Sequence, residues 1–469
     1  MMKKQLVSLF AVALTMTSVS FADHLSFTVK LNDDATINSM NTLTSMQLES
    51  IAKLSNVQKQ NNHYIMEFET INDTYFAKDS KQAKKAYDFH KAMQITRQLQ
   101  KNSAIEYALY RGVDVTTMAI NQEKVNFSDT TAFDSGSRWD DQWDMHGRYS
   151  VYAKKAWKRL KNKKLNEVTV AITDTGIAEH APNDINDRVI RGLYFKQDSS
   201  GPVYFKNDPT DRGSYHGTHV AGTIGAVGPV IRGITAKIPQ VKLVAVKVLG
   251  DNGSGRTDAV DAGIEWAVGA KAGEDLVPKG TPANPNPAQV VNISLGSQKD
   301  PQMSDKDWST YTQEYCKQWQ GVVKIAHQHN AVLVIAAGNG NDNGPTDVSE
   351  SLPAGCVGGD SIVVSATGPK GELAFYSNTT NNPKTLGNNY AIKAPGGNDP
   401  KGTKPEKKIL STVDNGYGYK QGTSMATPHV AGIVALIYAK NKSISYQQAQ
   451  KQATSSKTDG IIDASKAVL

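Results

Sequence analysis

The sequence predicts an α/β fold of three layers, in which helices cover both faces of a mainly parallel sheet. Two observations predict it. Segments beginning at His216 and at Ala426 are rich in small or apolar residues and are suited to buried helices. Short apolar runs, rich in β-branched residues, have the pattern of strands buried on both faces; they are residues 168–173, 241–249, 290–293, 332–335 and 362–364.

The N-terminus has the pattern of a secretory signal peptide over residues 1–22. A basic start, Met1 to Lys4, precedes an apolar stretch from Leu6 to Val19 and a small-x-small site at residues 20–22. The apolar stretch is short of the ~18 to 20 residues that a membrane span requires. We therefore expect secretion to the extracellular space without stable membrane association.

Residues 23–125 differ in composition from the C-terminal part of the chain, with few glycines and an α+β pattern. Strand-like stretches occur at 27–30, 64–69 and 104–110, with a helix expected near 46–53 and a longer one over 81–99. Residues 126–138, rich in Ser, Thr, Asp and Gly, predict an exposed linker. Residues 139–469 are long enough to form one large core.

A serine near the C-terminal end occupies a position suited to a nucleophile. In Gly422-Thr423-Ser424 the glycine permits a sharp turn, and the serine stands where an apolar helix begins. A serine hydroxyl becomes reactive only when a base takes its proton and fixed donors stabilise the oxyanion. By itself such a segment is more often structural, so its partners decide the interpretation.

Both partners occur upstream of this serine. The strand over 168–173 delivers Asp174 at its carboxyl end, and His216 starts a helix rich in small residues. His216 is the candidate general base. The three motifs, in the order Asp174, His216, Ser424, resemble those of the subtilisin-like serine proteases, the subtilase family. The resemblance extends from about Gln142 to Val468.

The resemblance implies a secreted serine endopeptidase that hydrolyses peptide bonds of proteins through an acyl-enzyme intermediate, without a cofactor. Ser424 would attack the carbonyl, His216 would transfer the proton, and Asp174 would hold the imidazole. Residues 23–125 would be a propeptide that assists folding and inhibits the active site, and residues 126–138 would be the processing region. A separate N-terminal adaptor domain is the alternative for residues 23–125.

The resemblance also assigns residues around the substrate. Asn339 would donate its side-chain amide to the oxyanion beside the Ser424 backbone N–H, although Asn-Gly alone is equally typical of a turn. Two segments would pair with an extended peptide and line a pocket for an apolar side chain before the cut; the residues are Gly253, Ser254, Gly255, Ser294, Leu295, Gly296 and Gly338.

The two cysteines, Cys316 and Cys356, flank the segment that holds Asn339. An even number in a secreted chain favours a disulfide, and two buried thiols are the alternative. The bridge would close a loop of roughly forty residues, worth about 4 kcal/mol on the chain-entropy model.

Metal and nucleic-acid binding receive weaker support. Structural calcium is common in subtilases, and Asp208 and Asp211 offer two carboxylates in a turn before His216. The basic run over 154–164 is more typical of the solvated face of a helix anchored by Trp157 than of a nucleic-acid site, because it lacks interleaved stacking aromatics.

The expected partners are protein or peptide substrates and the chain's own propeptide, and nothing in the sequence indicates more than a monomer. Two other functions use the same residues. One is a secreted pseudoenzyme that binds peptides in the same groove without cutting them, and the other is an esterase with the same triad.

Overall fold

The structure is a computed structural model that describes residues 24–32, 51–70, 81–120, 137–198, 201–341, 344–356, 360–379 and 390–469. The expected signal peptide and residues 126–136 of the expected linker lie outside these ranges.

The N-terminal part forms a small antiparallel sheet in the order β2-β3-β1-β4, with one helix, α2, against it. The elements are β1 (His24–Leu31), β2 (Ala52–Gln60), β3 (His63–Thr70), α2 (Lys81–Leu99) and β4 (Ile105–Tyr110). The strands expected at 27–30, 64–69 and 104–110 and the helix expected over 81–99 are confirmed.

The helix expected near 46–53 is wrong where the structure describes it. Ala52 and Lys53 lie in β2 and pair with Thr70 and Glu69 of β3. A turn with a positive φ of 52° at Asn61 folds β2 back along β3. The hydrogen bonds between the two strands therefore decide the conformation, whatever the local helical preference. Residues 46–50 lie outside the described residues.

A large sheet forms the centre of the remaining chain, in the order β21-β22-β18-β17-β15-β13-β6-β11-β8-β9 among the described residues. The pairs from β22 to β8 are parallel, and the two outermost pairs are antiparallel. The strands are β6 (Val168–Asp174), β8 (Val189–Gln197), β9 (Val203–Lys206), β11 (Val241–Lys247), β13 (Val290–Ile293), β15 (Val332–Ala336), β17 (Ile362–Thr367), β18 (Tyr390–Pro395), β21 (Lys457–Thr458) and β22 (Ile461–Ile462).

Helices pack on both faces of this sheet, because successive strand residues point to opposite sides. In β6, Val168, Val170 and Ile172 join the core under α10, whereas Ala171 joins the core under α7 and α8. The first face carries α4 (Ala153–Leu160), α6 (His216–Gly225), α10 (Thr423–Lys440), α11 (Tyr446–Ser455) and α12 (Ala464–Ala467); the second carries α7 (Thr257–Val268) and α8 (Asp305–Gln328). The short helices are η1 (Trp139–Asp141), α3 (Trp143–His146), α5 (Asn183–Asn186), η2 (Val348–Glu350) and η3 (Pro405–Lys407).

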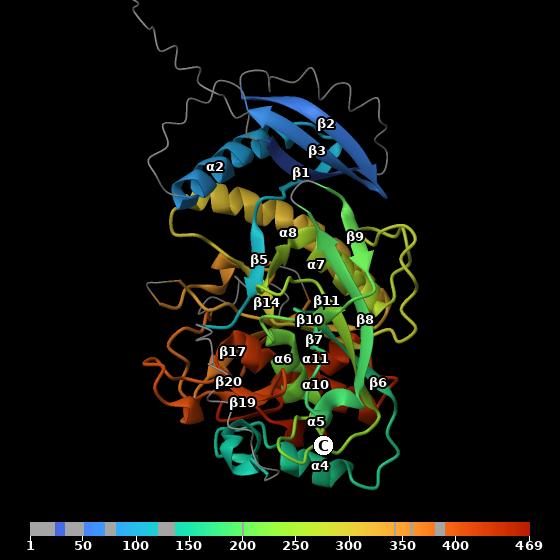
Figure 1. Cartoon of the computed structure of the whole chain (residues 1–469), viewed down its shortest axis with the longest axis vertical. Helices are drawn as coiled ribbons and strands as arrows, with labels where there is room; N and C mark the ends of the chain where they lie inside the picture. The colour runs from blue at the N-terminus through green and yellow to red at the C-terminus, as the bar shows by residue number, and fades with distance from the viewer. Residues whose placement is uncertain are drawn as a thin grey trace, which may run out of the picture.

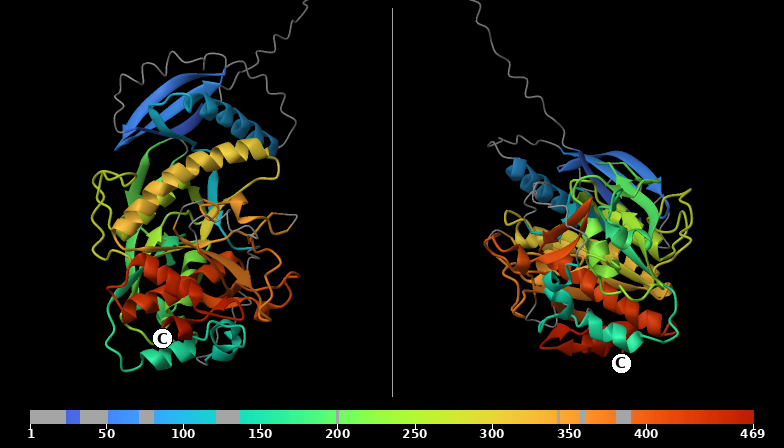
Figure 2. Two further views of the ribbon diagram at one scale, coloured as in Figure 1. Left: turned by 180° about the vertical axis from the view of Figure 1, so that it is seen from behind. Right: turned by 60° about the horizontal axis from the view of Figure 1, so that its bottom comes forward.

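The N-terminal sheet and α2 lie against α8, at the end of the molecule away from α4 (Figures 1 and 2). Their buried residues form one continuous core with α7 and α8. Below them the chain continues as β5 (Asp114–Thr117), which enters a second small sheet in the order β12-β5-β14-β16. The other strands of that sheet are β12 (Ser254–Arg256), β14 (Leu295–Gln298) and β16 (Ser351–Leu352). Two separate two-stranded sheets are formed by β7 (Ile177–Ala178) with β10 (Thr210–Asp211) and by β19 (Ile409–Val413) with β20 (Gly416–Lys420).

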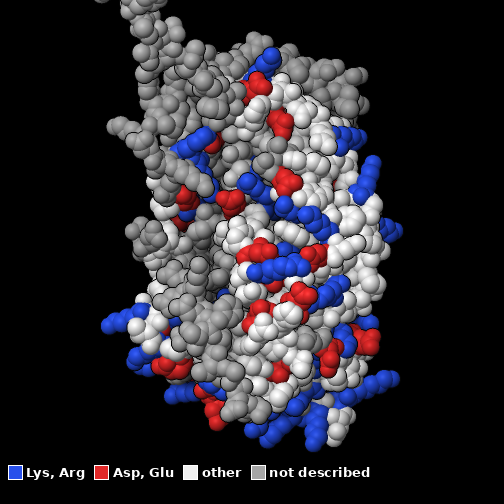
Figure 3. Space-filling model, in the orientation of Figure 1, with Lys and Arg blue, Asp and Glu red and all other residues white. Residues whose placement is uncertain are grey.

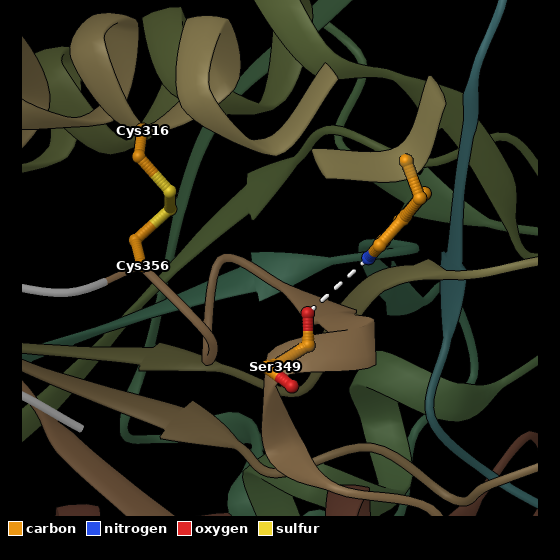
Figure 4. The surroundings of a disulfide bond; sticks show 4 residues. Cys316, Ser349 and Cys356 are labelled. Carbon is orange, nitrogen blue, oxygen red and sulfur yellow. Dashed lines mark hydrogen bonds between the residues drawn. A yellow bond between two sulfur atoms is a disulfide. The ribbon is translucent and has the colours of Figure 1, made fainter. Parts of the chain in front are cut away.

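Cys316 and Cys356 form a disulfide, with their Cα atoms 5.3 Å apart. Figure 4 shows Cys316 on α8 and Cys356 just beyond the loop that holds Ser349. The Ser349 carbonyl accepts a hydrogen bond of 3.2 Å from Trp308 Nε1, also on α8. The predicted bridge therefore fixes the loop that includes β16 against α8.

Basic and acidic side chains are interspersed over most of the face in Figure 3, with basic ones gathered at the end where Figure 1 places α4. On α4, Lys154, Lys155 and Lys158 are exposed, whereas Trp157 is buried. The basic run is therefore the solvated face of an amphipathic helix, as expected. Among the described helices, none is long and apolar enough to cross a membrane.

Candidate active site

Asp174 and His216 lie together at the carboxyl edge of the large sheet. Asp174 is the last residue of β6, and His216 is the first residue of α6. The Nδ1 atom of His216 lies 2.8 Å from Oδ1 and 2.9 Å from Oδ2 of Asp174. Both side chains are fully buried. Because a carboxylate only accepts, His216 Nδ1 carries the proton and Nε2 is the atom that can act as a base.

Ser424 lies at the start of α10, the helix that is buried along almost its whole length. Its hydroxyl donates to the carbonyl oxygen of Ser294 at 2.8 Å, and the Ser294 hydroxyl donates to the carbonyl oxygen of Ser424 at 2.9 Å. Among the described residues, His216 Nε2 has no hydrogen-bond partner. In this arrangement the serine hydroxyl is held by Ser294 rather than by the imidazole.

Asn339 follows β15 and reaches the same helix start. Its Oδ1 accepts hydrogen bonds from the backbone N–H and from the hydroxyl of Thr423, both at 2.9 Å. These two bonds fix the amide plane and leave the NH2 group available to donate. A donor locked in this way needs no reorganisation when negative charge develops beside Ser424.

Asp211 supports the residues that follow Asp174. The Thr175 hydroxyl donates to the Asp211 carboxylate and accepts from the backbone N–H of Gly217. The backbone N–H of Thr175 donates to Asp174 Oδ1 at 2.7 Å. Burial raises the pKa of Asp211, and the bond from Thr175 opposes that rise. Asp211 therefore fastens the end of β6 to the start of α6.

The calcium site expected at Asp208 and Asp211 does not fit this geometry. Asp211 is buried and bonded to Thr175, whereas Asp208 pairs with Arg212 at 2.9 Å on the surface. The bond from Arg212 lowers the pKa of Asp208 to about 2. Within the described part of the chain, no group of three or more His, Cys, Asp or Glu side chains is placed to hold a metal ion. We therefore assign no metal to these two carboxylates.

A strand of the N-terminal part occupies the groove beside these residues. β5 pairs antiparallel with β12 on one side and with β14 on the other, between the two segments expected to hold a peptide. Gly255 is opposite Val115, and Gly296 is opposite Thr116. The backbone N–H of Thr117 donates to the Gly253 carbonyl at 3.0 Å. The groove is thus occupied by a segment of the same chain.

The backbone of Met118 contacts Ser424. Its carbonyl oxygen accepts from the backbone N–H of Ser424 at 3.0 Å, and its own N–H donates to the Ser294 carbonyl at 3.3 Å. Two residues later the N–H of Ile120 donates to the Gln421 carbonyl at 3.0 Å. A Cβ atom at Gly422 would lie 2.3 Å from the Met118 oxygen, so only glycine lets the chain approach this closely.

The Met118 side chain is 4% exposed and lies against Gly296, where a Cβ atom would come within 2.7 Å of its terminal methyl group. Gly338, also expected in this pocket, has a positive φ of 97°, and a Cβ atom there would lie 2.5 Å from Ser351 Oγ. The absence of a side chain at Gly296 leaves space that the methionine fills, whereas Gly338 lies against Ser351 and Asn378.

Sequence reasoning predicted the triad residues, Asn339 and the two flanking segments; the structure pairs Asp174 with His216, places Asn339 on Thr423 beside Ser424, and places the two segments on either side of β5. Sequence reasoning did not find Met118, Gln421 or the supporting role of Asp211. The β-branched stretch Val115-Thr116-Thr117 was the available signal for a strand, but nothing local in the sequence shows which strands lie beside it.

The sequence profile of the Subtilase family matches residues 166–466. The chain belongs to this family, and the predicted family and α/β fold are confirmed.

The chain is 34% identical over 342 residues to an extracellular basic protease of Dichelobacter nodosus, covering 65% of this chain and 48% of that protein. It is 35% identical over 296 residues to an extracellular protease of Xanthomonas campestris, covering 57% and 43%. It therefore spans about half the length of these relatives. A solved structure of a protease from Pseudoalteromonas arctica matches with a TM-score of 0.55 and 30% identity, covering 71% of this chain and 98% of that one.

Proposed function

We propose that this protein is a serine endopeptidase that hydrolyses peptide bonds of proteins. One observation carries the proposal. Met118 belongs to an extended peptide segment, and its carbonyl oxygen accepts a hydrogen bond from the backbone N–H of Ser424, at the site where Asp174 and His216 are paired. Peptide carbonyls that bind there are placed for attack by the serine hydroxyl.

The chemistry follows from the positions of these groups. Ser424 Oγ leaves the Ser294 carbonyl, donates to His216 Nε2 and attacks the peptide carbonyl while His216 takes its proton. Catalytic hydrogen bonds are often absent from resting sites and form only as the reaction proceeds. Asp174 stabilises the imidazolium, and the oxyanion binds to the Ser424 N–H and the Asn339 amide. His216 then returns the proton to the leaving amine, and a water molecule, deprotonated by His216, hydrolyses the acyl-enzyme and restores the Ser424 hydroxyl.

The first substrate of Ser424 is its own chain, and the bond between Met118 and Ala119 is the first bond cut. Met118 supplies the carbonyl, and Ile120 extends the bound peptide beyond the bond through its contact with Gln421. Residues 23–118 then act as a bound inhibitor. Later cuts in the linker expected at 126–138 would then shorten the chain that begins at Ala119.

The contacts between the N-terminal sheet and α7 and α8 support inhibition by this segment. Asp258 of α7 accepts from Thr28 Oγ1 at 2.6 Å and from Arg111 Nε at 3.1 Å, with Arg111 and Asp258 almost fully buried. Glu314 of α8 accepts from the Ala108 N–H at 2.7 Å. A segment anchored to the catalytic domain at these carboxylates holds β5 in the groove.

The relatives named extracellular, together with the signal-peptide pattern at residues 1–22, support secretion of this chain. Catalysis needs no metal or organic cofactor, since the side chains of the groove supply the base, the nucleophile and the oxyanion donors. We expect the mature enzyme to act as a monomer, because the groove is completed by residues of a single chain.

The test compares the wild-type chain with Ser424→Ala, expressed in a host lacking other proteases. The wild type should release a protein fragment whose new N-terminus is Ala119, and it should hydrolyse a denatured protein substrate. Ser424→Ala should keep residues 23–118 attached and hydrolyse nothing.

Ser309→Ala, on the exposed face of α8, is the matched control and should mature normally. Normal maturation of Ser424→Ala would remove self-processing from the proposal. A wild-type enzyme that binds peptides in the groove but cuts neither peptides nor esters would be a pseudoenzyme, and one that cuts only esters would be an esterase.

A further inference from the structure

Upstream positions are counted back from the bond between Met118 and Ala119, so that Met118 is the first upstream residue and Asp114 is the fifth. The fifth residue is the first of β5, at the end of the groove farthest from Ser424. It makes contacts with the catalytic domain through both its backbone and its side chain.

The backbone contact comes from Ser297 of β14. Its hydroxyl donates to the carbonyl oxygen of Asp114 at 2.9 Å. Ser297 is 3% exposed, so this donor is held inside the groove wall rather than on a mobile surface side chain. Because the acceptor is a backbone carbonyl, this contact fixes where the fifth residue lies without regard to its side chain.

The side-chain contact comes from Arg256 of β12. Arg256 is directly opposite Asp114 in the antiparallel pairing, and its Nη1 lies 3.1 Å from Asp114 Oδ1. Among the described residues, Asp114 is the carboxylate within ion-pair distance of Arg256. Asp114 also pairs with a second cation, Lys85 of α2. Lys85 belongs to residues 23–118 and leaves the catalytic domain when that segment is released.

From these contacts we propose that Arg256 and Ser297 form a fifth upstream subsite that favours an acidic side chain in substrates. This inference rests on the proposed function, since it takes its register from cleavage after Met118. In substrate complexes Arg256 meets the fifth residue without competition from Lys85. The subsite adds a charge preference to a groove that otherwise recognises backbone and apolar side chains.

The expected preference is modest. The Arg256 side chain is 27% exposed and that of Asp114 is 43% exposed, so water and salt screen the pair. Exposed ion pairs of this kind change rates by roughly two- to fivefold.

Asp258 lies two residues after Arg256 and loses its bond to Arg111 when residues 23–118 leave. Arg256 turning toward Asp258 in the mature enzyme would abolish the preference.

The experiment uses the self-matured enzyme and three quenched fluorescent peptides containing the sequence of residues 114–120, with Asp, Asn or Lys at the fifth upstream position. At low salt the wild type should show kcat/KM values roughly two- to fivefold higher for Asp than for Asn, and lowest for Lys. The Asp preference should vanish in 1 M salt, because the screening length there falls to ~3 Å.

Arg256→Gln should give equal values for the Asp and Asn peptides, and Arg256→Glu should favour Lys. Ser297→Ala should lower all three values by a similar factor. Lys158→Gln, which removes one exposed charge on α4, should retain the wild-type preference. Cleavage after Met with equal Asp and Asn values in the wild type, or a preference unchanged in Arg256→Gln, would overturn the subsite while leaving the proposed activity intact. Failure to cut any peptide after Met would instead overturn the proposed register, and the subsite with it.

Discussion

The carbonyl oxygen of Met118 accepts a hydrogen bond of 3.0 Å from the backbone N–H of Ser424. This bond connects the N-terminal segment to the catalytic serine and sets the register of the chain in the groove. On the proposed function, the bond between Met118 and Ala119 lies where a substrate bond would lie, and the precursor would be a complex of the enzyme with its first substrate.

Asn339→Ala should lower kcat while leaving KM nearly unchanged. Thr423 holds Oδ1 of Asn339, so the free NH2 group serves the oxyanion that forms only during the reaction. Loss of the equivalent donor in subtilisin costs ~10² to 10³ in kcat. Steady-state kinetics on a peptide substrate measures both constants. Asn339→Asp, of similar size but without the donor, should be similarly impaired, and full turnover in either variant would remove Asn339 from the site.

Met118→Lys should slow self-cleavage at least about tenfold, because the buried side chain lies against Gly296 and burying an unpaired cation is costly. Met118→Leu, which conserves volume, should mature at close to the wild-type rate. Pulse-labelled precursor followed over time gives both rates. Equal rates for Lys and Leu would show that this pocket does not select the first cut.

Replacing both Cys316 and Cys356 by Ala should destabilise the mature enzyme by about 4 kcal/mol on the chain-entropy model, for the 40-residue separation between them. Activity at low temperature should change less, since the disulfide contacts no catalytic side chain. Thermal unfolding and initial rates compare the two effects. Two free thiols in the secreted wild type, found by mass spectrometry, would refute this prediction.

Inhibition by the isolated segment 23–118 should weaken as the pH falls below about 6.5. His63 is buried against Tyr107, and burial lowers its pKa from the ordinary value of 6.5, although Asp275 opposes the shift. The bound segment therefore favours neutral His63, whereas exposure of His63 to water on release would return its pKa toward the ordinary value of 6.5. A lowered pKa in the bound state means that binding is strongest above 6.5 and is lost as the pH falls.

The inhibition constant should rise by at most about tenfold per pH unit, the limit for one proton. His63→Gln should remove this dependence. His90→Gln serves as the comparison, because His90 is half exposed and lies 2.7 Å from Asp307 of α8, so this variant removes another histidine contact with the catalytic domain while leaving His63 in place. An inhibition constant that is flat from pH 7 to pH 5 for the wild type would rule out His63 as the titrating group.

The amino-acid sequence predicted the three-layer fold and, through its resemblance to the subtilases, the site residues Asp174, His216, Ser424 and Asn339. Each lies at the end of a strongly apolar strand or at the start of a small-residue helix, and such local patterns place a side chain at a sheet edge without knowledge of distant contacts. The pairing of Cys316 with Cys356 was predictable for a different reason, since a chain with two cysteines allows a single intramolecular pairing.

Contacts between distant parts of the chain set which peptide bond lies beside Ser424, which partner the Asp211 carboxylate has and how the stretch at Ala52 folds. Backbone pairing between strands carries no side-chain code, so the register that places Met118 at Ser424 could not be derived from the sequence of β5. Asp211 had the composition of a calcium-binding turn, but burial against Thr175 gave its carboxylate another partner. In each case a contact with residues distant in sequence decided the outcome, and local preference did not.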